Sequence, residues 1–428
     1  MRSGALALVG ALAALSAAQA TSTSTPLTLA EALAMAKQKN GTVKSAEYLV
    51  KAADQRVIES LSAFLPTVTP TYTYNSSRQQ LPAVNGTQFL QTEGGATAIN
   101  SSLTLIDAGQ RGFNLSSSRR SLSSQRFSAR QTLRTTLFSV TQQFYETLRA
   151  QELLNVSQSE VDRTAQILAQ TKARIQVRDA AAIEELQANA DYQNARVALL
   201  VSRNSVSTNT ATLKGLIGFD SDQALPSLQK TDAPTATLAQ SSDTLIRRGL
   251  ADRPDLLALR QSVAAARYSY LSADRNANLG FSASLTYDQQ VTPTWLQDRA
   301  LLFTLSYPLF DGGFTRAAAR ELHANYFSQK ETLVQSERSA QAEIESAFAE
   351  SSQNRDRLDA ASTALDAAQK NYTAALESQK LGSYDLIQVL TANVSLVTAQ
   401  SNYIQAIYDF AISDVKLKLV TGQPIPGE

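Results

Sequence analysis

The sequence predicts an α+β membrane protein in which a long α-helical coiled-coil barrel continues into a transmembrane β-barrel, with four strands from each chain. Three observations favour this fold. The chain contains an internal repeat, each half carries a pair of strands with alternating apolar and polar residues, and each half carries a long helical segment. Segments of this kind are typical of membrane strands and of packed long helices.

The first 20 residues have the pattern of a secretory signal peptide. Arg2 precedes an apolar stretch over 4–15, and the small residues of 18–20 suit a cleavage site. We therefore expect an exported mature chain that begins near Thr21. The apolar stretch is too short for a spanning helix, which needs about 20 residues, and no later window is apolar over 18 residues. Insertion into a membrane would therefore use strands.

The composition argues against several functional classes. The chain has no cysteine, which excludes disulfides, thiol chemistry and a lipid-accepting cysteine. Its single histidine, His323, is expected on a helix surface, so most metal sites and nucleophile–base pairs are excluded. The net charge of +1 leaves no basic stripe for nucleic acid. The sequence carries no phosphate-binding glycine-rich loop, so any energy for transport would come from another protein. We expect no cofactor and no enzymatic activity.

An internal repeat aligns 107–218 with 311–422 at a shift of 204 residues without a gap. The predicted units are residues 21–220 and 242–422, joined by a linker over 221–241 and followed by a tail over 423–428. Each unit should contain a helix, a strand hairpin, a long helix, a turn and a helix. The matched pairs include Asp107 with Asp311, Gly109 with Gly313, Phe144 with Phe348, Ile183 with Ile387, Asn189 with Asn393 and Gly218 with Gly422.

The strand hairpins are expected at about 66–107 and 279–311. Each strand alternates over about ten residues, which is typical of a membrane strand with an apolar outer face and a polar lumen. A half-buried sheet in a soluble domain is the alternative for a single hairpin, but four similar strands in an exported chain favour the membrane. The apolar residues are Val68, Pro70, Tyr72, Tyr74, Ile99, Leu103, Leu105, Phe281, Ala283, Leu285, Tyr287, Leu301, Phe303, Leu305 and Tyr307.

Outer turns are expected where glycine and proline interrupt the hairpins, at Asn85-Gly86, Gly94-Gly95 and 293–295. Four strands would leave two open edges, which lipid does not tolerate, so further copies must complete the barrel. Two copies would give eight strands and a filled lumen, whereas three would give twelve and leave room for a channel. A conducting function therefore selects a homotrimer.

Long helices are expected to follow each hairpin. Asp107 and Asp311 suit helix caps, and Gly109, Gly312 and Gly313 suit the turn from the barrel into the helix. A heptad stripe then predicts a helix over 112–176, about 100 Å long. Two shorter helices, over 29–61 and 180–216, would match that length end to end. The stripe comprises Leu133, Leu137, Val140, Phe144, Leu154, Val161, Ala165, Leu168 and Ile175.

Several segments resemble the outer membrane efflux protein family. They are 27–33, 64–66, 251–256, 306–313 and 381–390, and together they run over nearly the whole mature chain. The resemblance implies an outer-membrane homotrimer with a twelve-stranded barrel and a long periplasmic tunnel of twelve helices. It also implies that this duct docks onto a periplasmic membrane-fusion adaptor driven by an inner-membrane pump, and that it exports small toxic molecules or polypeptides.

The resemblance further assigns the tip turns at about 177–180 and 381–384 to adaptor contact and gating. The contact residues would be Val177, Arg178, Asp179, Leu381, Gly382 and Ser383, although Arg178 stands where a glycine is usual. Family members often carry acidic residues beyond the second tip, and here the matching residues are Gln388 and Thr391. Acidic charge could still come from Glu184 and Asp385. The predicted periplasmic aperture comprises Glu184, Tyr384, Asp385, Gln388 and Thr391.

Two other functional classes compete with a duct. The helices alone would also suit a non-conducting periplasmic coiled-coil protein, either structural or an adaptor. The polar face of every strand argues against it, because a water-filled lumen requires such a face. An enzyme finds little support, because carboxylates such as Glu184 and Glu185 lie on a charged helix that is expected to be solvated.

Overall fold

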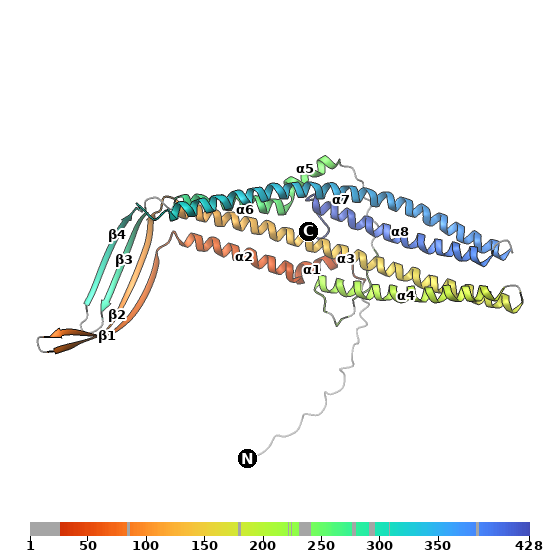
Figure 1. Ribbon diagram of the computed structural model, residues 1–428, viewed down its shortest axis with the longest axis horizontal. Coiled ribbons are helices and arrows are strands. Elements are labelled where there is room, and N and C mark those ends of the chain that lie inside the picture. Colours follow the sequence, from red (N-terminus) through yellow and green to blue (C-terminus); the bar gives the residue numbers. More distant parts are fainter. Residues whose placement is uncertain are drawn as a thin grey trace, which may run out of the picture.

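The computed structural model describes residues 26–83, 86–178, 181–220, 222–223, 225–230, 241–275, 280–290, 296–307, 309–381 and 385–428. The molecule is elongated, with a sheet at one end and long helices running away from it (Figure 1). The predicted signal peptide, most of the predicted linker and the turn at 293–295 lie outside the described residues.

Each half has the same order of elements, with two short helices, a strand hairpin, a helix of 67 residues and a returning helix. No helix in the described ranges has the length and apolar content needed to cross a bilayer. The first half comprises α1 Leu29–Lys39, α2 Gly41–Ser62, β1 Thr67–Ala83, β2 Gly86–Ile106, α3 Gln110–Gln176 and α4 Ala182–Ile217. The second comprises α5 Ser242–Asp252, α6 Pro254–Arg275, β3 Gly280–Gln290, β4 Leu296–Ser306, α7 Phe314–Lys380 and α8 Leu386–Val420.

The four strands form one antiparallel sheet in the order β1-β2-β3-β4. Its register places the predicted apolar residues in rows, since Leu103 pairs with Ala283 and Ala283 pairs with Phe303. Polar residues form the alternate rows, for example Ser102 opposite Ser284. Because directly opposed residues share a face, the predicted alternation of an apolar and a polar face is confirmed.

The outer turn predicted at Gly94-Gly95 is wrong, because both glycines lie inside β2, opposite Asn75 and Tyr74. A Cβ at Gly95 would lie 2.9 Å from the hydroxyl of Tyr72, so the ring occupies the space that a side chain would need. Glycine within a strand often marks such a close approach. The strands of the first hairpin have 17 and 21 residues and are consequently longer than the roughly ten predicted, and the hairpin extends beyond β3 (Figure 1).

The turns from strand to helix have the same local structure in both halves. One carboxylate oxygen of Asp107 accepts the N–H of Gly109 at 3.2 Å, and the other accepts the N–H four residues on at 2.8 Å. Asp311 does the same for Gly313 and for the residue four positions on, both at 2.9 Å. Gly109 and Gly313 have φ of 89° and 87°, the left-handed region that favours glycine.

The single helix predicted over 29–61 is wrong, because the chain breaks at Asn40 into α1 and α2. The Asn40 side chain accepts the N–H of Thr42 at 2.8 Å and donates to the carbonyl of Leu216 at 2.9 Å. It therefore caps α2 and also supplies a hydrogen-bond donor to a backbone carbonyl in the last turn of α4. The second half breaks at the corresponding place, Arg253, between α5 and α6.

The main core lies midway along the helices, where α1, α3, α4 and α8 meet. Its fully buried members include Ala36, Leu137, Phe144 and Leu213. The order in which the helices lie side by side differs between the two sides of this core. Toward the sheet α3 packs against α2 and α6, and α6 packs against α7; beyond the core α3 packs against α4 and α8, and α8 packs against α7.

His323 lies on α7 as an exposed residue, which confirms the expected surface helix position. Its ring lies between Tyr270 and Phe327, tilted against the first and edge-on to the second, with centroid distances of 4.7 and 4.8 Å. This ring contact gives the side chain a packing role. Within the described residues, no group of three or more His, Asp or Glu side chains is arranged to hold a metal ion.

Candidate functional site

Two helical hairpins, α3–α4 and α7–α8, end together at the pole opposite the sheet (Figure 1). Val177 directly follows α3 and Leu381 directly follows α7, with 74% and 82% of their surfaces exposed. Large apolar side chains in this position are unfavourable in water, so the tips have the character of a contact surface. The predicted tip and aperture residues that lie outside the described part of the chain are Asp179, Gly382, Ser383 and Tyr384.

Arg178 closes the first tip in a left-handed conformation with φ of 61°. Its N–H donates to the carbonyl of Ile175 at 2.9 Å. Such a conformation costs a non-glycine residue roughly 1–2 kcal/mol. The departure from the usual glycine is therefore accommodated at the cost of backbone strain.

In the first turns of α4 and α8 the same kind of cap occurs, in which a side chain accepts the backbone N–H of the residue three positions earlier. Glu184 accepts the N–H of Ala181 at 3.3 Å, and Gln388 accepts the N–H of Asp385 at 2.7 Å. These residues are related by the shift of 204 in the repeat. The Gln388 side chain is therefore held against its own helix by a hydrogen bond.

Glu184 also lies 3.8 Å from the guanidinium of Arg174, across the first tip. Thr391 lies one turn further along α8 than the cap, and its hydroxyl donates to the carbonyl of Ile387 at 2.8 Å. The structure thus brings Glu184 and Thr391 to the two sides of one cavity, whereas Asp385 and Gln388 are not among its lining residues.

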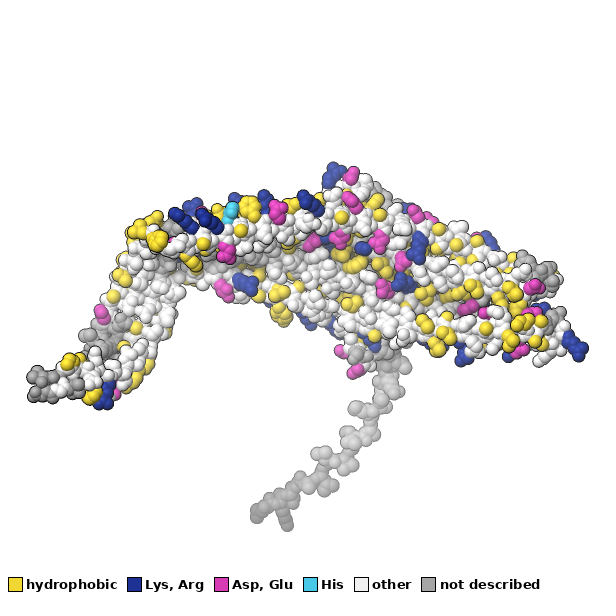
Figure 2. Space-filling model, in the orientation of Figure 1, with side chains coloured by type: hydrophobic (Ala, Val, Ile, Leu, Met, Phe, Trp, Pro, Cys, Tyr) yellow, Lys and Arg dark blue, Asp and Glu magenta, His cyan; other side chains and the backbone are white. Residues whose placement is uncertain are grey.

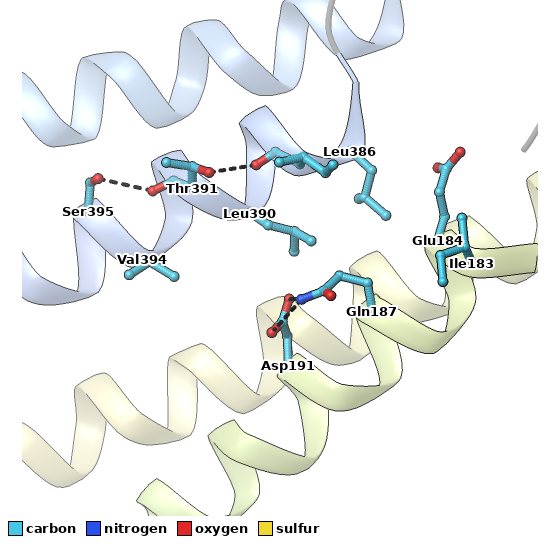
Figure 3. Close-up of a pocket in the computed structure, with 10 residues that line it drawn as sticks. Ile183, Glu184, Gln187, Asp191, Leu386, Leu390, Thr391, Val394 and Ser395 are labelled. Atoms are coloured by element: carbon cyan, nitrogen blue, oxygen red, sulfur yellow. Dashed lines mark hydrogen bonds between the residues drawn. The ribbon is translucent and has the colours of Figure 1, made fainter. Parts of the chain in front are cut away.

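This cavity, which we call the tip cavity, has a volume of about 520 Å³ and lies between α4 and α8 (Figure 3). Its floor is formed by Leu386 and Leu390, which are buried against Ile167 and Leu168 of α3. In Figure 3 Leu390 points across the cavity toward α4. The lining residues are Ile183, Glu184, Gln187 and Asp191 on α4 and Leu386, Ile387, Leu390, Thr391, Val394 and Ser395 on α8.

Sequence reasoning found Glu184 and Thr391 but missed the other lining residues. A signal was nevertheless present, because Ile183, Gln187 and Asp191 recur every four residues and therefore lie on one helix face. The residues 204 positions later are Ile387, Thr391 and Ser395, which face them across the cavity. The tip cavity therefore lies between two faces that the repeat relates.

A polar bridge joins the two hairpins at the level of the tip cavity, through a residue of α8 that lies between the lining residues Thr391 and Ser395. Asn393 on α8 donates to Glu160 at 2.8 Å and accepts from Arg163 at 3.1 Å, both on α3. Arg163 and Glu160 also form an ion pair at 3.0 Å. Burial raises the pKa of Glu160, although Arg163 and Asn393 act in the lowering direction. Only the buried position of Asn393 makes this bridge possible, and the sequence shows merely that it matches Asn189.

Comparison with known proteins shows which family this chain resembles over both of its halves. The family described as outer membrane efflux protein matches residues 32–219 and 245–423. The efflux protein BepC of Brucella suis is 26% identical over 409 residues, covering 92% of this chain and 85% of that protein. The outer membrane protein TolC of Vibrio cholerae is 24% identical over 412 residues, covering 92% and 90%.

The fold is also that of a solved channel structure. The outer-membrane channel OprN superposes with a TM-score of 0.82 at 18% sequence identity, over 92% of this chain and 90% of that chain. Members of the family are transport channels that are trimeric and work with adaptors and pumps. The family match covers both halves of the chain and hence both helical hairpins and the sheet. The chain therefore belongs to the outer membrane efflux protein family and is an outer-membrane duct of a tripartite efflux system.

Proposed function

We propose that three copies of this chain form the working duct, with a continuous wall from the periplasmic tips to the outside. The open edges of the protomer carry the proposal. Within the described residues β1 and β4 each pair on one side only, and an unpaired strand edge is not tolerated in lipid. Three copies would join β4 of one protomer to β1 of the next and give twelve strands around a channel.

The helical part supports the same closure. Toward the sheet α2 and α7 are the outermost helices, and both expose large apolar side chains, such as Ile58 at 53% and Phe314 at 73%. Apolar side chains in these positions are covered when α2 of one copy packs on α7 of the next. One arrangement of copies therefore closes both the sheet and the helical wall.

The test is a measurement of mass and conductance on the same preparation. We expect the purified protein to have three times the protomer mass and to give discrete conductance steps in a planar bilayer. A monomeric mass without conductance would contradict the duct and favour a non-conducting periplasmic coiled-coil protein.

We infer that the tips contact a periplasmic adaptor, which couples the duct to an inner-membrane pump that supplies the energy. Exposed Val177 and Leu381 support this, because they form an apolar surface at the pole furthest from the sheet. The cargo class of such a system, small toxic molecules or polypeptides, is proposed from the family as a whole.

The aperture is proposed to be lined by Glu184 and Asp385, with Gln388 and Thr391 on the same turns of α8. Acidic side chains in a narrow pore favour cations. The double variant E184Q/D385N should therefore lower the ratio of cation to anion permeability in single-channel recordings. E345Q, which changes an exposed acid far from the tips on α7, is the control and should leave the ratio unchanged. An unchanged ratio in the double variant would remove these residues from the aperture.

A further inference from the structure

The polar groups of the tip cavity are almost all hydrogen-bond acceptors. The hydroxyls of Thr391 and Ser395 donate to carbonyls of their own helix, at 2.8 and 3.0 Å, so only their oxygen lone pairs remain for a ligand (Figure 3). The Gln187 amide nitrogen donates to Asp191, which leaves its carbonyl oxygen as an acceptor. The remaining polar lining groups are the carboxylates of Glu184 and Asp191.

Among the described residues, the lining of the cavity contains two carboxylates and no Lys or Arg, so the lining has a negative charge. The carboxylate of Glu184 forms an ion pair with the guanidinium of Arg174 at 3.8 Å. Asp191 instead accepts two hydrogen bonds of 3.3 Å from the neutral amide of Gln187. The negative charge of Asp191 also acts to raise the pKa of the nearby Glu160 carboxyl. A cation next to Asp191 would be attracted by its carboxylate, whereas an anion would be repelled.

The rest of the cavity is apolar. Leu386 and Leu390 form a buried floor, while Ile183, Ile387 and Val394 keep 68%, 70% and 62% of their surfaces in water at its rim. An apolar ligand group placed on the floor would also cover these rim side chains. Its binding would be favoured because apolar surface is removed from water, as it is in the protein core. The volume of about 520 Å³ is within the range of pockets for small ligands.

We propose that the tip cavity binds amphiphilic ammonium ions, with the apolar body on Leu386 and Leu390 and the N–H donors directed at Asp191. Acceptor-only polar groups, negative charge and an apolar floor together select this chemistry. The proposal rests on the proposed function, because it names a cargo class that meets the duct at its periplasmic entrance.

Dansylcadaverine is a suitable probe, because it carries a primary ammonium and its dansyl fluorescence reports an apolar environment. Binding would be measured by fluorescence titration of the full-length trimer in lipid nanodiscs, which avoids competition by detergent. N-acetylated dansylcadaverine has the same fluorophore without the charge. The variant D191N removes the charge and keeps the shape, and D366N, an exposed acid on α7 outside the cavity, is the matched control.

We expect D191N to weaken binding of the ammonium probe about tenfold or more, because a charged hydrogen bond is lost. D366N should bind as the unmodified protein does, and the acetylated probe should bind at least about tenfold more weakly. Equal affinity of D191N would overturn the proposal. Equal affinity of the acetylated probe would also overturn it, because the cavity would then bind apolar molecules irrespective of charge.

Conductance steps recorded on the same variants separate this inference from the proposed function. Conducting trimers that fail to bind the probe would remove the ligand site and leave the duct intact. Probe binding with the expected D191N effect in a protein that gives no conductance steps would support the site and contradict the duct.

Discussion

Replacing Arg134 by methionine is expected to lower the stability of the helical part by about 3 kcal/mol, because it leaves buried acceptors without a donor. The Arg134 side chain is 1% exposed and lies 3.5 Å from a carboxylate oxygen of Glu428. Its guanidinium donates to the carbonyls of Lys418 and Gln423. Arg134 therefore holds the segment after α8 against α3.

The physical reason is the cost of burying polar groups. Burial lowers the pKa of Arg134, while the nearby Glu428 acts to raise it. Without the guanidinium, the Gln423 carbonyl must find water, and the segment over 421–428 would detach. Its detachment would expose Ile425, now 5% exposed in the main core.

Thermal unfolding followed by circular dichroism, together with limited proteolysis of the last residues, would measure this effect. R130M is the matched control, because Arg130 binds the same Glu428 at 2.8 Å but its side chain is 57% exposed. An exposed ion pair contributes about 0–1 kcal/mol, so R130M should unfold almost as the unmodified protein does. Equal losses in the two variants would show that Arg134 does not anchor the segment.

The strands illustrate what local patterns can predict. Leu103, Ala283 and Phe303 each fit a period of two, and the observed register places them in one row. Period-two alternation depends only on backbone geometry, so a single strand already carries it. The same holds for the caps at Asp107 and Asp311, where the required residues lie within four positions of each other.

Features that depend on distant partners were missed. The break at Asn40 is supported by a bond to Leu216, which is 176 positions away in the chain. Gly95 lies inside β2, where the ring of Tyr72 on the neighbouring strand occupies the space of a side chain. The bridge between Glu160 and Asn393 spans 233 positions. Local patterns contain no information on which buried polar groups will meet.

The tip cavity lies between these two cases. Its two faces follow from the spacing of four residues and from the repeat, but their opposition across the cavity requires α4 and α8 to pack on the same side of α3. The repeat also shows how the two faces differ. Asp191 carries the charge in the first half, and Ser395 takes its place in the second.

Glutamates at Leu200 and Val201 are expected to abolish the trimer, which is the largest effect predicted for the assembly. Beyond the core α4 is an outermost helix, and apolar side chains lie along it (Figure 2). Val197, Leu200 and Val201 keep 60%, 63% and 65% of their surfaces in water. Leu200 and Val201 follow Val197 by three and four residues, so both lie next to Val197 along one stripe of the helix.

The other outermost helix in this region, α7, exposes small residues such as Ala360, Ala364 and Ala367. Large side chains on α4 of one copy can pack among these alanines of the next, as knobs fit into holes between helices. Charges placed in such an interface would be buried without a partner, at a cost of several kcal/mol each. A trimer contains three such interfaces, so this free-energy cost arises three times.

The mass of L200E/V201E, measured in the same detergent as the unmodified protein, should be that of one protomer, and its conductance steps should disappear. V177E adds one charge at an exposed apolar residue of the tip and should leave the trimer intact. A trimeric L200E/V201E would mean that the stripe on α4 does not lie between copies. The closure of the duct would then depend on the strands and on α2 alone, and the stripe would be available to a partner of a different kind.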